Sequence, residues 1–247
     1  MITVIYEDKD LLVCFKPPGI PTQTASLSTP DVVSMVKAHL VKTGAPKDPY
    51  LGLIHRLDQP VSGLLVLAKN KKTASLEITK KQYYALCQGE PVDKQGKLHH
   101  YLWKNPKTNM AEVVDKNFTL NGKKEAKEAV LSYEVIKNIS TMEENKIINE
   151  SKTEEEIKKE NIATASLMKV NLETGRFHQI RAQFSAIGHP LLGDLKYGSE
   201  ESKELSGQKG IKTIALCAYR LKFMHPANKK IMEFQVPKEL LPFWIKE

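Results

Sequence analysis

The apolar runs of this chain are short, and this limits what it can fold into. The longest uninterrupted ones, Leu11–Phe15 and Leu64–Ala68, have about five residues, whereas a transmembrane helix needs roughly 20. Many runs are rich in β-branched residues and are bounded by Gly, Pro or Asn, which is typical of strands joined by turns. Strand-like runs outnumber helical ones and do not alternate with them strictly. The sequence therefore predicts an α+β fold without a membrane span.

The predicted strands begin with a hairpin, in which Val4–Tyr6 and Leu11–Phe15 pair across a polar turn. Further strands are expected at Leu64–Ala68, Tyr83–Cys87, Val130–Ile136 and elsewhere in 97–137, Ile162–Leu172, 213–223 and 231–236.

The first predicted helix has Thr29 as its N-cap, Pro30 in its first position and Gly44 at its end. Further helices are expected at 71–81, Arg176–Ile187 and Pro237–Ile245.

Residues 138–161 differ in composition from the rest of the chain. They contain no aromatic residue, and Ile139–Asn161 holds seven Glu and four Lys. Such a segment is either a solvated helix or a flexible excursion, and we assign it no chemistry. The sequence thus predicts a single domain over residues 1–247 with a polar insertion at about 138–161.

The chain is basic, with a formal net charge of +8. The insertion contributes −3, so the remainder carries +11. Such a surplus indicates a polyanionic partner, either nucleic acid or an anionic membrane. The cations are 33 Lys and only four Arg, Arg56, Arg176, Arg181 and Arg220. Because a guanidinium is planar and always charged, the few arginines mark positions to inspect for specific roles.

The N-terminus has neither the basic nor the apolar region of a signal peptide. The three cysteines, Cys14, Cys87 and Cys217, lie far apart in apolar segments and form no CxxC pair. Their number and spacing argue against a disulfide framework or a zinc site. We therefore expect a protein of the reducing cytoplasm.

The first chemistry-bearing segment lies just before the apolar run at Leu64. His55, Arg56 and Asp58 fall within four residues, and Pro60 and Gly63 indicate a turn. A loop supported by a rigid strand is where reactive groups are often presented. Asp58 is a candidate nucleophile or general base. The alternative is that Asp58 caps the turn and His55 only packs.

The second segment runs from Glu173 to Asp194. Helical spacing places Phe177, Ile180 and Phe184 on one side, with Arg181 along the edge of that apolar face. An arginine there can pair with a buried carboxylate. The alternative is a solvated surface arginine.

Taken together, these segments resemble the RluA-type RNA pseudouridine synthase family. His55–Leu65 is similar to the family motif HRLDxxTSG, and Gly175–Arg181 is similar to GRTHQIR. Further similarities cover Ile187–Gly198 (IGHPxxGDxxYG), Tyr6–Gly19 (YEDxxLLVVNKPxG), Lys80–Gly89 (KxYxAxVxG) and Leu216–Leu221. The ordered matches span nearly the whole chain. The resemblance implies a mixed, largely antiparallel sheet with flanking helices and a central active-site cleft.

The resemblance also implies a reaction, the isomerisation of uridine to pseudouridine in structured RNA, either ribosomal or transfer RNA. The bond from N1 to C1′ breaks, the uracil turns, and C5 bonds to C1′. No net redox change or group transfer occurs, so the family needs neither a cofactor nor a metal. The uridine leaves its stack to reach the enzyme, and surface lysines hold phosphates. We expect a monomer in the cytoplasm with RNA as partner and no membrane.

The resemblance further implies roles for individual residues. Asp58 matches the catalytic aspartate, which either attacks C1′ or removes the C2′ proton. Tyr83 matches the active-site tyrosine that stacks on the uracil and assists the late loss of the C5 proton. Arg181 matches the basic residue that pairs with the aspartate. Matched substrate-binding positions are Arg56, which helps to fill the space left by the flipped base, and His55, Arg176 and Gln179.

Two residues depart from the family pattern, since Val61 and Phe177 each stand where threonine is usual. Both lie beside matched catalytic positions, so they affect local hydrogen bonding more than activity. Many relatives carry an N-terminal S4 RNA-binding domain. The first strand is expected to begin at residue 2, so we expect no such domain here.

Other functions remain as alternatives. A non-catalytic RNA-binding protein on the same fold predicts loss of the reactive residues, yet Asp58, Tyr83 and Arg181 are present. Phosphoryl transfer is opposed by the missing DFG motif and Gly-rich loop, and a serine hydrolase by the missing GxSxG. A membrane-surface protein needs a basic amphipathic helix that the sequence lacks. The pair His99–His100 and the cysteines are expected to be structural or surface residues.

Overall fold

The computed structural model describes residues 2–24, 29–140 and 164–246. The insertion predicted at 138–161 thus lies almost entirely outside the described residues. These residues form two compact units. Unit 1 comprises residues up to Tyr84, Asn171–Glu173 and the chain from Leu216; unit 2 comprises Ala85–Val170 and Thr174–Ala215. The prediction of a single domain stays a prediction, and each unit is described by itself.

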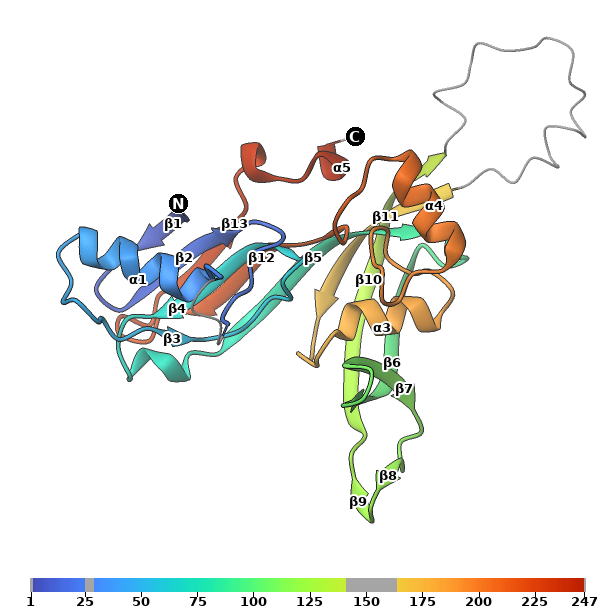
Figure 1. The fold of residues 1–247 in the computed structure, drawn as a ribbon, viewed down its shortest axis with the longest axis horizontal. Helices are drawn as coiled ribbons and strands as arrows, with labels where there is room; N and C mark the ends of the chain where they lie inside the picture. Colours follow the sequence, from blue (N-terminus) through green and yellow to red (C-terminus); the bar gives the residue numbers. More distant parts are fainter. Residues whose placement is uncertain (1, 25–28, 141–163, 247) are drawn as a thin grey trace, which may run out of the picture. The chain divides into compact units, whose positions relative to one another are not determined.

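Unit 1 is built on a sheet whose strands follow the path β1–β2–β4–β12–β5, with β3 paired to β4 and β13 to β12 (Figure 1). The predicted hairpin is confirmed, since β1 and β2 pair antiparallel. Every residue of β2 and β4 is buried, which makes this pair the centre of the unit. The strands are β1 (Thr3–Glu7), β2 (Leu11–Lys16), β3 (Gly52–Leu53), β4 (Ser62–Ala68), β5 (Ile78–Gln88), β12 (Leu216–Met224) and β13 (Ile231–Gln235).

Helix α1 (Val32–Lys42) begins two residues later than the sequence predicts. Its N-cap is Asp31, whose side chain accepts a hydrogen bond from the Ser34 N–H, while Ser34 Oγ accepts one from the Asp31 N–H. This reciprocal capping satisfies the free N–H groups of the first turn. The prediction of Thr29 as N-cap is therefore wrong, whereas Gly44, with φ of 103°, follows the helix end as expected.

A helix was expected at 71–81, and this prediction is wrong. Asn70 Oδ1 accepts hydrogen bonds from the N–H and hydroxyl of Thr73, and this starts only a single 3₁₀ turn, η1 (Thr73–Ser75). Strand β5 begins at Ile78, where Thr79 Oγ1 donates to the carbonyl of Lys222 on β12. Pairing with a neighbouring strand overrides the local helical pattern.

Unit 2 contains the end of β5, from Ala85, and its sheet follows the path β5–β11–β10–β6–β7. Its strands are β6 (Gln95–Asn105), β7 (Met110–Val114), β10 (Lys127–Ser140) and β11 (Thr164–Leu172), whose last two residues belong to unit 1. Between β7 and β10 in the chain, β8 (Thr119–Leu120) and β9 (Lys123–Lys124) pair as a small hairpin. It lies beyond the ends of these two longer strands (Figure 1). The mixed, mostly antiparallel sheet with few helices confirms the predicted α+β class.

Helix α3 (Gln179–Ala186) packs against β6 and β7. It starts three residues later than predicted because His178 has φ of 51°, a left-handed conformation that cannot continue an α-helix. Helix α4 (Glu200–Gln208) was not predicted from the sequence. The end of the chain forms a 3₁₀ turn, η3 (Lys238–Leu240), and α5 (Phe243–Lys246), in place of one short helix. Within the described residues, no helix has the length and hydropathy that crossing a membrane requires.

Gly63 fixes the distance between two central strands of unit 1. It lies opposite Ala218 where β4 and β12 run parallel, and its φ is +131°. A Cβ atom at this position would lie 2.5 Å from the backbone N of Ala218. Neither the backbone conformation nor the space tolerates a side chain.

We therefore expect Gly63→Ala to lower the free energy of unfolding by about 2–5 kcal/mol, through backbone strain and overpacking. The control is Gly207→Ala in α4, where a Cβ atom meets nothing within 4 Å. That change should raise the free energy of unfolding by about 0.5–1 kcal/mol. Urea unfolding followed by circular dichroism measures both, and equal effects would contradict the role of Gly63.

Candidate active site

Asp58 lies in unit 1 on the loop that joins β3 to β4. The Thr22 hydroxyl holds the preceding residue, donating to the Leu57 carbonyl at 2.7 Å and accepting from the Leu57 N–H at 3.2 Å. The Asp58 carbonyl accepts a hydrogen bond from the Val61 N–H at 3.0 Å. Leu57 and Val61 are buried, whereas Asp58 is half-buried. The loop thus presents Asp58 from a backbone that is anchored on both sides.

Lys16, at the end of β2, lies beneath this loop. Its Nζ donates to the carbonyls of Pro17, Gln59 and Val61 at 3.1, 2.8 and 2.6 Å. Burial lowers the pKa of Lys16 to about 8, and the negative charge of Asp58 opposes this shift. Sequence reasoning placed Lys16 at the end of a strand and within the segment Tyr6–Gly19 that is similar to YEDxxLLVVNKPxG, and gave it no role of its own. A charged residue that closes a fully apolar run just before two prolines was the available signal.

Tyr83, on β5, is buried in the same unit. Burial raises the pKa of its phenol, and the negative charge of Asp58 raises it further. Burial also raises the pKa of the Cys217 thiol to about 12. Both groups are therefore uncharged at neutral pH, and Asp58 supplies the negative charge that acts on Tyr83. The structure brings the predicted catalytic residues Asp58 and Tyr83 into one electrostatic environment.

The other predicted residues of this loop have different surroundings. The Nε2 atom of His55 accepts a hydrogen bond from the Val66 N–H at 3.3 Å, and burial lowers the pKa of this imidazole to about 3. His55 is therefore neutral and bonded to the backbone. Arg56 is exposed and donates to Gln23 Oε1 at 3.0 Å. That His55 and Arg56 bind substrate stays a prediction. Of the two side chains, Arg56 is the more accessible to solvent.

Arg181 lies in unit 2, where it forms a buried ion pair that the sequence left unassigned. Its Nε and Nη2 donate to Asp194 Oδ2 and Oδ1 at 2.7 and 2.9 Å. The two side chains are 5% and 0% exposed, and the guanidinium lies over the ring of Tyr197. Arg181 is thus no solvated surface arginine, and the expectation of a buried carboxylate partner is met by Asp194. Its pairing with Asp58, which belongs to the other unit, stays a prediction.

Asp194 also organises the chain around it. Its Oδ1 accepts hydrogen bonds from the N–H groups of Lys196 and Tyr197 at 3.0 and 3.2 Å. The Tyr197 hydroxyl accepts from the Ala111 N–H and contacts His178 Nδ1. The sequence signal was the Gly193–Asp194 pair within the segment similar to IGHPxxGDxxYG.

Arg176 lies in the loop before helix α3, and Gln179 is the first residue of this helix. Gln179 is buried; its Oε1 accepts from the Thr174 hydroxyl and the Arg176 N–H, and its Nε2 donates to the Val130 carbonyl. These contacts fasten the loop before α3 to β10. Arg176 is exposed, and its Nε donates to the Glu128 carbonyl at 2.7 Å. Substrate binding by either residue stays a prediction, and Gln179 has an evident structural role.

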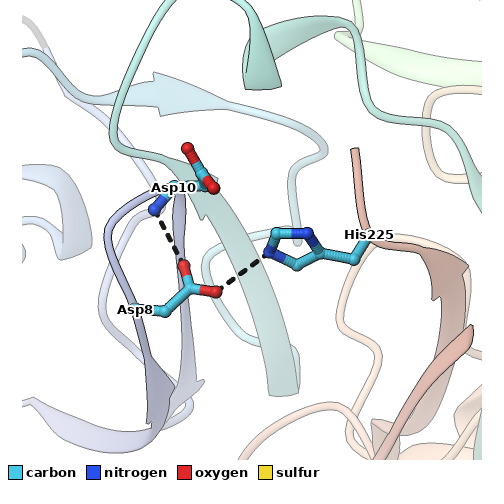
Figure 2. A group of neighbouring side chains, drawn as sticks. All are labelled: Asp8, Asp10 and His225. Carbon is cyan, nitrogen blue, oxygen red and sulfur yellow. Dashed lines mark hydrogen bonds and ion pairs between the residues drawn. The ribbon is translucent and has the colours of Figure 1, made fainter. Parts of the chain in front are cut away.

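A separate polar cluster joins the β1–β2 turn to the end of β12 (Figure 2). It consists of Asp8, Asp10 and His225, whose possible metal-ligand atoms lie within 4.8 Å of one another. The Nδ1 atom of His225 faces the N–H groups of Ala227 and Asn228, so its Nε2 carries the hydrogen donated to Asp8 Oδ2.

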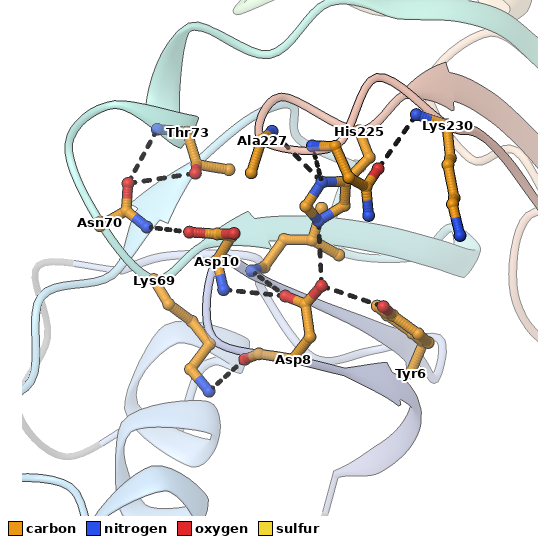
Figure 3. A network of polar contacts seen from close by, with 11 residues as sticks. Tyr6, Asp8, Asp10, Lys69, Asn70, Thr73, His225, Ala227 and Lys230 are labelled. Atoms are coloured by element: carbon orange, nitrogen blue, oxygen red, sulfur yellow. Dashed lines mark hydrogen bonds and ion pairs between the residues drawn. The ribbon is translucent and has the colours of Figure 1, made fainter.

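The other hydrogen bonds of the Asp8 carboxylate stabilise the turn between β1 and β2 (Figure 3). Its Oδ1 accepts from the N–H groups of Asp10 and Leu11, and its Oδ2 also accepts from the Tyr6 hydroxyl. A metal ion would have to displace these hydrogen bonds. We therefore assign the cluster to the stability of unit 1, where it fastens two distant parts of the chain to each other.

Comparison with known proteins agrees with this geometry. Two solved human structures, RNA Pseudouridylate Synthase Domain Containing 1 and 4, match 98% and 99% of this chain and 85% and 90% of their own, each with a TM-score of 0.68. At 20% and 21% identity, they show that the fold is that of a pseudouridine synthase domain. The model of the RNA pseudouridylate synthase family matches residues 10–186. The chain belongs to this family of RNA-modifying isomerases.

Relatives with similar sequences span most of the chain. An uncharacterized RNA pseudouridine synthase of Aquifex aeolicus is 32% identical over 95% of this chain and 69% of its own length. The ribosomal large subunit pseudouridine synthase C of Vibrio parahaemolyticus is 28% identical over 96% of this chain and 65% of its own. The activity shared by this family is the isomerisation of uridine to pseudouridine in RNA.

The buried ion pair yields a stability prediction. Asp194→Asn leaves the Arg181 guanidinium buried without its carboxylate, so we expect the free energy of unfolding to fall by about 3–5 kcal/mol. The control is Lys203→Met, which breaks an exposed pair with Glu200 and should change stability by less than about 1 kcal/mol. Chemical denaturation compares the two variants; similar small effects would show that the buried pair is dispensable.

Proposed function

We propose that this protein isomerises uridine to pseudouridine in structured RNA, with Asp58 as the catalytic carboxylate. The observation that carries the proposal is a half-buried carboxylate on an anchored loop, with buried Tyr83 and Lys16 in its electrostatic environment. Such a group can attack C1′ or remove the C2′ proton, and a rigid loop limits the reorganisation that either step needs. The isomerisation involves no net oxidation or reduction, so it requires no redox partner.

Tyr83 has a narrower role in this proposal than the family resemblance implies. Because burial and the charge of Asp58 raise its pKa, the phenol keeps its proton at neutral pH. A neutral phenol is a poor base but a suitable stacking and hydrogen-bonding surface for uracil. We propose that Tyr83 orients the base. Arg181 is proposed to pair with Asp58 in addition to Asp194, and the exposed Arg56 is proposed to contact the RNA.

We further propose that the β8–β9 hairpin contacts RNA phosphates. Lys123 and Lys124 are exposed on the hairpin, and Lys116 and Lys127 are exposed beside it. Asn121 and Gly122 both have positive φ in the turn between the strands. Within the described part of the chain, none of these four lysines forms an ion pair with a carboxylate. Unpaired lysines on a projecting hairpin bind phosphates without reading sequence.

The catalytic proposal predicts that Asp58→Asn removes activity. The amide keeps the size of the side chain but loses its charge and basicity, so the rate should fall about 10⁴-fold or more. The measurement is tritium release from transcripts containing [5-³H]uridine, because C5 exchanges its hydrogen for the bond to C1′. Asp48→Asn, at an exposed carboxylate of the same unit, is the control. An active Asp58→Asn variant would refute the assignment.

The RNA target is identified by mapping pseudouridines in total RNA with and without this protein. Ribosomal large-subunit RNA is the first candidate, because relatives such as the Vibrio enzyme are named for it. A site lost from transfer RNA alone would place the target there. An unchanged map in both RNA classes would count against activity in the cell.

The hairpin proposal predicts weaker and less salt-dependent RNA binding by Lys123→Ala/Lys124→Ala. If both lysines contact phosphates, the slope of log K against log salt should decrease by roughly 1.4–1.8. Lys42→Ala/Lys47→Ala removes the same charge from exposed positions of unit 1 and is the control. Filter binding across a salt series measures both, and equal slopes in the two variants would show only a general charge effect.

A further inference from the structure

Phe177, in the loop before α3, carries a lysine side chain over its aromatic ring. The ring stacks on the imidazole of His178, with the two ring centroids 3.7 Å apart and the planes inclined by 20°. The Nζ atom of Lys104, on β6, lies 4.5 Å from the centroid of the Phe177 ring. Because the imidazole covers one face of this ring, the ammonium lies over the other. The three side chains form a short stack within unit 2.

The Phe177 ring is held in place by the protein beneath it. It is half-buried and packs against a buried cluster formed by Leu102, Ala111, Ala129, Ala182 and Tyr197. The His178 imidazole is held in turn, since its Nδ1 atom lies 2.9 Å from the Tyr197 hydroxyl. Lys104 itself is exposed. A fixed ring therefore restricts a long side chain that would otherwise sample many rotamers.

The ring positions the Lys104 ammonium without cancelling its charge. A carboxylate partner would neutralise the lysine and compete with an anionic ligand, whereas an aromatic ring attracts the cation only through its quadrupole. Among the residues that the structure describes, Lys104 forms no ion pair. Such a cation is ordered and uncompensated. It is prepared to bind an anion, because less side-chain entropy is lost when the anion arrives.

The position of the stack indicates that this anion is an RNA phosphate. The exposed Arg176, for which the family resemblance implies substrate binding, immediately precedes Phe177. The exposed Lys196 donates from Nζ to the carbonyl of Asn109 at 3.2 Å, in the turn between β6 and β7. Lys104 lies near the end of β6, just before the same turn. Three segments of unit 2 thus bring cations to this region, and the polyanion on which the family acts is RNA.

We propose that Lys104 binds a backbone phosphate of the RNA substrate and that Phe177 is the residue that positions it. The inference rests on the proposed action of this protein on structured RNA. It is particular to this chain, because the family usually has threonine where Phe177 stands, and threonine offers no aromatic face to a cation. The competing explanation is that Lys104 and Phe177 only stabilise unit 2. In that case neither side chain affects RNA binding.

The experiment measures RNA binding by filter retention across a series of salt concentrations. The probe is an unmodified transcript, either a transfer RNA or a fragment of large-subunit ribosomal RNA, whichever the wild-type protein binds more tightly. Lys104→Met should raise the dissociation constant about tenfold at low salt and reduce the slope of log K against log salt by roughly 0.7–0.9, as expected for one phosphate contact. Lys104→Arg keeps the charge and the contact with the ring, so its dissociation constant should stay within about threefold of the wild-type value.

A double-mutant cycle tests the part played by Phe177. Phe177→Leu keeps an apolar side chain against the buried cluster but removes the ring. The dissociation constant should therefore rise about threefold, with the salt slope unchanged because the lysine is still present. Combined with Lys104→Met, the same substitution should have no further effect on the dissociation constant. A purely structural effect of Phe177→Leu would instead persist in the absence of the lysine.

The matched control is Lys212→Met, which removes another exposed lysine of the same unit. It should change the dissociation constant by less than about twofold, because exposed charges away from the contact are screened by salt. Urea unfolding of every variant establishes that each dissociation constant belongs to folded protein. Lys104 is exposed, so Lys104→Met should fold normally, and it decides the phosphate contact even if Phe177→Leu does not fold.

The inference is overturned if folded Lys104→Met keeps the wild-type dissociation constant and salt slope, or if Lys212→Met loses as much affinity. Equal effects of Phe177→Leu with and without Lys104 would reject the positioning role of Phe177. An active Asp58→Asn would reject the catalytic assignment but would not alter these binding measurements. If the wild-type protein binds neither transcript, the proposed function is rejected together with the inference that rests on it.

Discussion

The anchoring of residues 57–63 is the constraint on which the candidate active site depends. Thr22 holds Leu57, Lys16 holds Gln59 and Val61, and Gly63 allows β4 to lie directly against β12. Each contact involves backbone atoms, so the loop has few ways to shift without leaving buried polar groups unpaired. A catalytic carboxylate on such a loop is pre-positioned for reaction, and little reorganisation remains for the moment when RNA binds.

The two units treat buried charge differently. Arg181 and Asp194 form a bidentate pair that removes both charges from solvent together. Lys16 instead faces carbonyl dipoles, which compensate its charge incompletely, and its pKa is lowered as a result. In the first arrangement, each buried charge is compensated by the opposite charge of its partner. The second leaves a cation that titrates near pH 8, within the range where its loss can be observed.

Local sequence patterns predicted the strands well and the helix boundaries less well. The β1–β2 hairpin and β4 are found as expected because period, turn residues and apolar character agree there. The helix start was assigned to Thr29, although Asp31 caps α1, because several residue types compete for an N-cap. The helix expected at 71–81 is absent because β5 finds a partner in β12, and helix α4 was missed for lack of a strong apolar period.

The sequence by itself determined the fold class, the family and the candidate residues Asp58, Tyr83 and Arg181, because ordered motifs identify them without coordinates. Only the tertiary structure revealed Lys16 and Thr22 around Asp58, and Asp194 as a partner of Arg181. It also placed His55 and Gln179 in backbone contacts. The physical reason is that Lys16, Thr22 and Gln179 each join a side chain to backbone atoms of residues distant along the chain. A backbone carbonyl is the same at every position, so its partners leave no pattern in the sequence.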